Sequence, residues 1–207
     1  MPGRFFTIPN ALTLFRIASA PLFMFLWFYF TGEQRIVAFW ACLIVACVSE
    51  ASDLLDGQIA RLTRQVSNFG KLMDPYADSI FRLTAFLCFA APIDDKPFYP
   101  LWMPILLVLR DIGTSVVRTF AVKEGIVVAA KVSGKIKAIA QGIVMIALLV
   151  LAISRHNHGM LEAEHFERFT RDATYMVGIV IVVAYWALAE HLWAHISVFR
   201  KSTVTSD

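Results

Sequence analysis

The segment from Asp53 to Asp78 reads DLLDGQIARLTRQVSNFGKLMDPYAD and holds four aspartates in a chain that is otherwise largely apolar. Carboxylates are costly to place in hydrocarbon, so acidic residues in such a setting indicate a functional site. If the first half of the segment is helical, one face, within a sector of about 140°, holds Asp53, Asp56, Gly57, Ala60 and Arg61. The small residues leave room for a ligand between the carboxylates and Arg61, whose planar fork suits phosphate.

The second half repeats the pattern, because Gly70, Asp74 and Asp78 form a stripe at i, i+4 and i+8 of a helix. Two helices joined by a short connection around Arg64 to Phe69 can bring all four carboxylates to one point. Four anions repel one another unless cations lie between them. Hard oxygen ligands with no nearby His or Cys favour Mg²⁺ or Mn²⁺ over zinc.

The rest of the chain is typical of a membrane protein. Of its 207 residues, 58% are hydrophobic and 13% aromatic, and the mean hydropathy is +0.64. Six apolar runs are long enough to span a bilayer, at about Ile8 to Phe30, Ile36 to Ser52, Leu72 to Pro92, Tyr99 to Val122, Ile136 to Ile153 and Ala173 to Phe199. We therefore predict one all-α, polytopic domain over residues 1–207 with about six transmembrane helices.

Charge predicts the orientation of these helices. With the N-terminus inside, the cytoplasmic ends and loops hold eleven Lys and Arg residues, and the opposite side, which includes a predicted polar loop from Ser154 to Asp172, holds five. This bias places both termini and the aspartates on the cytoplasmic side of the inner membrane. Charges within the runs fall near the middle or in the cytoplasmic halves, which predicts a polar cavity open to the cytoplasm.

A second basic group lies further along the chain. Arg110 and Arg118 are about two helical turns apart, and the sequence AAKVSGKIK follows at residues 129–137. The arginines, the three lysines and the Ser-Gly helix start predict a second anion site. Alternatively, Lys131, Lys135 and Lys137 are only topology signals that favour anionic lipid headgroups. Arg110 itself, near the middle of its run, needs an anion or a carboxylate such as Asp111.

The aspartate segment matches, without a gap, the signature of the CDP-alcohol phosphotransferase family, which it resembles at eight fixed positions. Members of that family are integral membrane enzymes that transfer a phosphatidyl or phospho-alcohol group from a CDP-linked donor to an alcohol and release CMP. The start IPNALTLFRI at residues 8–17, and the helix from Arg110 to Arg118 followed by GKIK at 134–137, resemble bacterial phosphatidylglycerophosphate synthases. The resemblance covers about residues 7 to 142.

The resemblance implies a role for each motif residue. Two Mg²⁺ or Mn²⁺ ions would be held by Asp53, Asp56, Asp74 and Asp78, and Asp78 would act as general base. The CDP part of the donor would be bound by Asp56, Gly57, Ala60, Arg61 and Gly70. The phosphate of the acceptor would be bound by Arg16, Arg110, Arg118 and Lys135.

The implied partners are CDP-diacylglycerol, sn-glycerol 3-phosphate, membrane lipids and a second copy of the chain in a homodimer; no nucleic acid is expected. Two positions differ from those synthases, which often carry Glu at Asp111 and Lys at Ser79; Arg82, one turn beyond Asp78, can supply that charge. Glu50 shares a face with Asp53 and either supports the site or adds a metal ligand.

Two alternatives to this function stay open. One is the same chemistry with inositol phosphate, serine or another alcohol as acceptor. The other is an ion or metal transporter, in which intramembrane aspartates line a pathway. The charge-free outer halves of the predicted helices argue against a continuous polar route across the membrane.

Overall fold

The computed structural model describes residues 8–63, 68–92, 97–123, 132–157 and 163–194. Within these ranges, side chains are outside the description at 8–10, 54–63, 68–72, 74–75, 120–123, 157, 163–165 and 194. The described residues form helices and contain no strand, as predicted. The helices are α1 (Ile8–Tyr29), a short 3₁₀ helix η1 (Gly32–Gln34), α2 (Arg35–Thr63), α3 (Asn68–Ala90), α4 (Trp102–Lys123), α5 (Val132–Asn157) and α6 (Ala163–Ala194).

Each predicted apolar run overlaps one of the six long helices, but two boundaries differ in informative ways. Helix α2 continues to Thr63 and α3 begins at Asn68, so both halves of the aspartate segment are helical, as the residue spacing required. The predicted polar loop from Ser154 to Asp172 is wrong in extent, because α5 continues to Asn157 and α6 begins at Ala163. The last part of the sixth predicted run, residues 195–199, lies outside the described residues.

Aromatic contacts explain the early start of α6. The Arg155 guanidinium lies 4.5 Å from the ring centroid of Phe166 and 5.4 Å from that of Phe169. Phe169 is buried and meets the ring of Phe98 edge-on at 4.7 Å. Cation–π and edge-to-face contacts of this kind stabilise the two helix ends against each other, although their sequence is polar.

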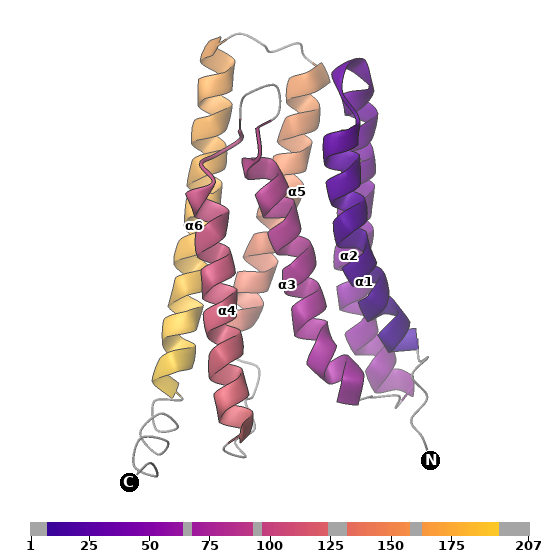
Figure 1. The fold of residues 1–207 in the computed structure, drawn as a ribbon, viewed down its shortest axis with the longest axis vertical. Helices are drawn as coiled ribbons and strands as arrows, with labels where there is room; N and C mark the ends of the chain where they lie inside the picture. Colours follow the sequence, from indigo (N-terminus) through magenta and orange to yellow (C-terminus); the bar gives the residue numbers. More distant parts are fainter. Residues whose placement is uncertain (1–7, 64–67, 93–96, 124–131, 158–162, 195–207) are drawn as a thin grey trace.

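The six helices form a closed ring in the order α1, α2, α5, α6, α4, α3, in which each helix packs against its two neighbours. Helix α3 also contacts α5 across the ring. Helices α1, α3 and α5 begin, and α2, α4 and α6 end, at the same end of the bundle, the lower end in Figure 1. The two halves of the aspartate segment therefore lie at that end, on the consecutive helices α2 and α3, which both pack against α1.

The bundle has apolar outward faces and charged residues within it. Val37, Ile143 and Val182 are 63%, 62% and 70% exposed, whereas Arg16, Arg82 and Arg110 are 1%, 3% and 6% exposed. This distribution is the reverse of that in a soluble protein and fits a molecule surrounded by lipid. The chain is therefore an integral membrane protein.

Four helices within the described ranges are long and apolar enough to cross a membrane, over Ala11–Tyr29, Gly32–Asp53, Val132–His156 and Phe166–Trp193. These spans lie in α1, in η1 with the first part of α2, in α5 and in α6. Helices α3 and α4 are less apolar because α3 carries Asp74, Asp78 and Arg82, and α4 carries Arg110, Asp111 and Arg118. These charged residues make α3 and α4 less suited to face lipid than the other four long helices.

An aromatic core lies toward the opposite end of the bundle. Phe23 and Trp27 of α1 stack on each other and meet Phe89 of α3 edge-on, with ring centroids 5.0 to 6.0 Å apart. The Tyr99 hydroxyl donates to the Phe86 carbonyl at 2.8 Å and ties the start of the α4 region to α3. This aromatic packing is therefore separate from the end of the bundle that holds the aspartates.

Candidate functional site

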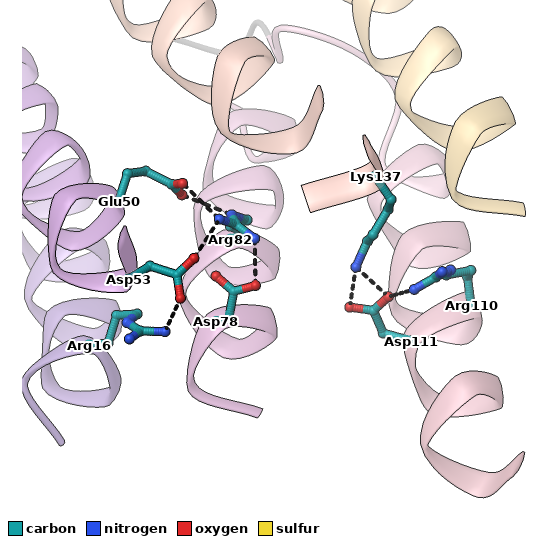
Figure 2. Close-up of polar contacts among 8 residues, drawn as sticks. All are labelled: Arg16, Glu50, Asp53, Asp78, Arg82, Arg110, Asp111 and Lys137. Atoms are coloured by element: carbon teal, nitrogen blue, oxygen red, sulfur yellow. Dashed lines mark hydrogen bonds and ion pairs between the residues drawn. The ribbon is translucent and has the colours of Figure 1, made fainter. Parts of the chain in front are cut away.

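Five charged side chains of α1, α2 and α3, which we call the aspartate cluster, meet inside the bundle: Arg16, Glu50, Asp53, Asp78 and Arg82. Glu50 and Asp53 are one turn apart on α2, and Asp78 and Arg82 are one turn apart on α3, so each helix presents its pair on one face. From α1, Arg16 Nη1 donates to Asp53 Oδ1 at 2.8 Å (Figure 2).

Arg82 is the centre of this cluster. Its Nε and Nη2 donate to the two oxygens of Glu50 at 2.8 and 2.7 Å, and its Nη1 donates to Asp78 Oδ2. Nη2 also lies 3.8 Å from Asp53 Oδ2. One guanidinium therefore contacts carboxylates from both halves of the sequence motif, which places Asp53 and Asp78 on either side of a single cation.

A second group, the Asp111 cluster, joins α4, α5 and α6. Lys137 Nζ donates to both oxygens of Asp111, at 2.8 and 3.1 Å, and Arg110 Nη1 donates to Asp111 Oδ1 at 2.9 Å. Arg110 Nε donates to the Ala184 carbonyl of α6 at 2.8 Å. All three side chains are buried, and Figure 2 shows them as a group separate from the aspartate cluster.

The two clusters approach each other between α3 and α4. Ser79, which directly follows Asp78 in the chain, and Asp111 both line a groove of about 450 Å³ between these two helices. Its lining is mainly apolar, with Ser79, Asp111 and Ser115 among its polar members.

Several predicted site residues lie outside the described side chains. They are Asp56, Gly57, Ala60, Arg61, Gly70 and Asp74, for which the backbone is helical. The structure brings together Asp53 and Asp78, the first and last aspartates of the motif, through Arg82. Their convergence agrees with the two-stripe arrangement that the spacing predicts.

The predicted acceptor-phosphate residues are divided between two places. Arg16 lies in the aspartate cluster and Arg110 in the Asp111 cluster, where it has the carboxylate partner expected from its depth. Arg118, two turns further along α4, is partly buried. Lys135 is exposed, whereas Lys137 points into the bundle.

The lysine that the sequence predicted for this site, Lys135, therefore lies two residues before Lys137, the lysine that faces the bundle interior. Lys135 and Lys137 are about 200° apart around a helix, so only one of them can face the bundle. The signal that identifies Lys137 is a stripe at i, i+4 steps along α5, all of whose members are buried: Ser133, Lys137, Gln141 and Met145. The mean hydropathy of a whole span does not show which face of the helix points into the bundle.

The donor chemistry fits a divalent cation. Asp53 and Asp78 already share one cationic group, and both offer hard carboxylate oxygens, which suit Mg²⁺ or Mn²⁺. No group of three or more His, Cys, Asp or Glu side chains that could hold a metal ion is found among the side chains that the structure describes, a set that omits Asp56 and Asp74.

Comparison with known proteins adds independent information. The family model for CDP-alcohol phosphatidyltransferase matches residues 6–188. A Bacillus subtilis (strain 168) protein named CDP-diacylglycerol–glycerol-3-phosphate 3-phosphatidyltransferase is 37% identical over 153 residues, 70% of this chain and 77% of the relative. A probable phosphatidylglycerophosphate synthase of Mycobacterium tuberculosis is 33% identical, with 75% and 71% of the two chains covered. A CMP-forming cardiolipin synthase of Streptomyces coelicolor is 37% identical over 52% of this chain and 48% of the relative.

Proposed function

The chain belongs to the CDP-alcohol phosphatidyltransferase family, and we propose that it transfers the phosphatidyl group of CDP-diacylglycerol to sn-glycerol 3-phosphate, forming phosphatidylglycerophosphate and CMP. The observation that carries this proposal is the meeting of Asp53 and Asp78 at one guanidinium inside a bundle with apolar outward faces. Because members of the family are transferases, the ion-transporter alternative is set aside.

The acceptor is supported by relatives and by charge. The proteins of Bacillus subtilis and Mycobacterium tuberculosis described above are named for glycerol-3-phosphate transfer or for phosphatidylglycerophosphate synthesis. In this chain, two cations, Arg110 and Lys137, share the single carboxylate Asp111, so this cluster has a net positive charge. Excess positive charge near the groove suits a phosphorylated, water-soluble acceptor better than a neutral one.

For the metal site, we propose that Asp53, Asp56, Asp74 and Asp78 hold two Mg²⁺ or Mn²⁺ ions. When bound, such ions offset the charge of the diphosphate and of departing CMP. The support is the chemistry of the four carboxylates and the shared contact of Asp53 and Asp78 with Arg82. Gly57, Ala60, Arg61 and Gly70 would frame the cytidine and its phosphates beside them.

Asp78 would take the proton from the primary hydroxyl of the acceptor. Arg82 engages one oxygen of its carboxylate, and this contact fixes the orientation of the group. Arg16, Arg110, Arg118 and Lys135 remain the proposed phosphate-binding residues, and we add Lys137 because it is buried beside Arg110. Proton removal at Asp78 and phosphate binding at the basic residues together direct one acceptor oxygen toward the diphosphate.

We further propose that all six long helices cross the inner membrane, around a polar cavity that opens to the cytoplasm. Both termini and the aspartate cluster would then lie on the cytoplasmic side. The excess of basic residues at that end of the helices supports this orientation. Resemblance to the family supports a homodimer, which the mass of the purified protein in native detergent micelles would test.

The decisive experiment is an acceptor screen. Purified protein would be incubated with CDP-diacylglycerol and Mg²⁺ or Mn²⁺, and with glycerol 3-phosphate, inositol phosphate, serine or phosphatidylglycerol in turn. We expect CMP release and a new lipid product with glycerol 3-phosphate, and neither in chelator. A product with inositol phosphate, serine or phosphatidylglycerol, and none with glycerol 3-phosphate, would refute the proposed acceptor.

A further inference from the structure

Glu50 is the one member of the aspartate cluster on α2 that the family motif does not include. It nevertheless makes the most complete contact in the cluster, since both of its carboxylate oxygens accept from the fork of Arg82, at 2.8 and 2.7 Å. Arg82 is 3% exposed. A buried, two-point contact of this kind fixes both the position and the plane of the guanidinium.

Helix α5 packs against the other side of the Glu50 carboxylate. A Cβ atom added at Gly142 would lie 2.8 Å from Glu50 Oε2 and 3.2 Å from its Cδ, closer than such atoms normally approach. The carboxylate is therefore held between the Arg82 fork and the α5 backbone. Any side chain at position 142 would push Glu50 away from its present place.

The position of Arg82 matters because three carboxylates compete for it. At present Arg82 binds Glu50 through two nitrogens and one oxygen of Asp78 through the third, and it remains 3.8 Å from Asp53. Without the Glu50 carboxylate, Nε and Nη2 lose their acceptors, and the single amide oxygen of Glu50→Gln can replace only one of them. Apart from Asp78, which already binds Nη1, the carboxylate within reach is Asp53, 3.8 Å from Nη2.

We propose that Glu50, backed by Gly142, is a positioning residue that keeps Arg82 from closing on Asp53, so that Arg82 orients Asp78 and leaves Asp53 available to the metal. This inference rests on the proposed metal site at the aspartate motif. Outer partners of metal ligands typically change metal affinity or activity by about 10–100-fold when they are mutated. The same range is expected for Mn²⁺ affinity when Glu50 is neutralised.

The test is Mn²⁺ binding by the full-length protein in detergent, measured from the loss of the free-ion signal in electron paramagnetic resonance. Wild type and Asp53→Asn are compared first. If the wild type has no Mn²⁺ binding that depends on Asp53, the proposed metal site fails. With that binding established, Glu50→Gln should raise the half-saturating Mn²⁺ concentration about 10–100-fold, and an unchanged value would overturn the inference.

A double variant separates positioning from direct ligation. If Glu50 acts through Arg82, removing the arginine as well, in Glu50→Gln/Arg82→Gln, removes the competitor and returns the Mn²⁺ midpoint most of the way to wild type. If Glu50 is itself a metal ligand, the double variant binds as weakly as Glu50→Gln or more weakly, and the proposal is wrong. The double variant also conserves net charge, so it remains informative if Glu50→Gln alone does not fold.

Gly142→Ala displaces Glu50 without removing any charge and provides a third measurement. We expect it to weaken Mn²⁺ binding in the same direction as Glu50→Gln but less, because the Glu50 side chain can partly adjust. Gly178→Ala in α6 is the matched control, since a Cβ there meets only Met103 Cε at 3.9 Å. Both substitutions raise helix propensity equally, so equal Mn²⁺ affinity in the two variants would contradict the role of the Gly142 contact.

Discussion

Asp111 binds two cations at one carboxylate. It accepts hydrogen bonds from Lys137 of α5 and from Arg110, which also donates to the Ala184 carbonyl of α6, so three helices are joined at this group. Removing one partner of a buried pair is costly because the other charge is left uncompensated. Here the loss of Asp111 would leave two buried cations beside each other.

We predict that Asp111→Asn destabilises the protein by about 3–5 kcal/mol through this uncompensated charge. Thermal unfolding of the purified protein in one detergent would measure the loss. Lys137→Met is the matching single variant, and the double variant Asp111→Asn/Lys137→Met should be more stable than the sum of the two losses predicts. Strictly additive losses would mean that the two side chains are not energetically coupled.

The role of Asp78 leads to a kinetic prediction. Asp78→Asn removes the proposed base and keeps the size of the side chain, so transfer to glycerol 3-phosphate should fall by about 10²–10⁴-fold. Binding of CDP-diacylglycerol should persist, because three other aspartates and Arg61 remain. CMP release and equilibrium binding of labelled donor are the two measurements. Turnover near the wild-type rate would remove Asp78 as base.

At the scale of the helices, the sequence predicts well which segments are helical and in what order they come. It predicts poorly how each helix is rotated about its own axis. Every apolar run corresponds to a helix, because a span in lipid must satisfy its backbone internally and has little alternative to an α-helix. The start of α6 was missed because residues 163–172 are polar and owe their helical state to Phe169 and its packing on Phe98. Tertiary contacts between distant residues have no signature in local hydropathy.

The same limit applies to the site. The motif spacing predicted that Asp53 and Asp78 approach each other. This prediction was possible because helical periodicity and the short connection between the two helices can be read from the local sequence. The spacing could not predict that Lys137 rather than Lys135 faces inward, or that Glu50 binds Arg82 through both carboxylate oxygens. Those contacts depend on how α5 and α3 are rotated about their axes, which the packing of the whole ring determines.

The early start of α6 can be tested with a proline. Arg171 has a side chain that is 60% exposed and lies in the ninth position of α6. Arg171→Pro should destabilise the protein by about 3 kcal/mol, because proline inside a helix removes a backbone hydrogen bond and clashes with the preceding turn. Thermal unfolding measures this loss, and Arg171→Ala is the control. If both variants unfold like the wild type, this segment is a loop, as hydropathy had predicted.

For the molecule as a whole, the number of membrane crossings depends on the two charged helices, α3 and α4. Helices α3 and α4 lie next to each other in the ring and carry the inward-facing Asp78, Arg82, Arg110 and Asp111. Four other helices are apolar enough to cross on their own. Charges that face the interior of a bundle are tolerated at membrane depth because neighbouring helices supply their partners. We therefore predict six crossings rather than four.

Labelling of introduced cysteines would distinguish the two topologies, in a chain whose Cys42, Cys47 and Cys88 are first replaced by alanine. Leu101 is 53% exposed and directly precedes α4, which begins at the same end of the bundle as α2. Glu33 lies in η1, directly before α2. With six crossings, Leu101→Cys and Glu33→Cys should both react with a membrane-impermeant maleimide in intact spheroplasts, and Lys135→Cys should react only after permeabilisation. If only α1, α2, α5 and α6 crossed, α3 and α4 would remain on the cytoplasmic side, and Leu101→Cys would behave like Lys135→Cys. If Leu101→Cys is not labelled in intact spheroplasts while Glu33→Cys is, six crossings are ruled out. If the protein has the reverse orientation, only Lys135→Cys of the three is labelled in intact spheroplasts.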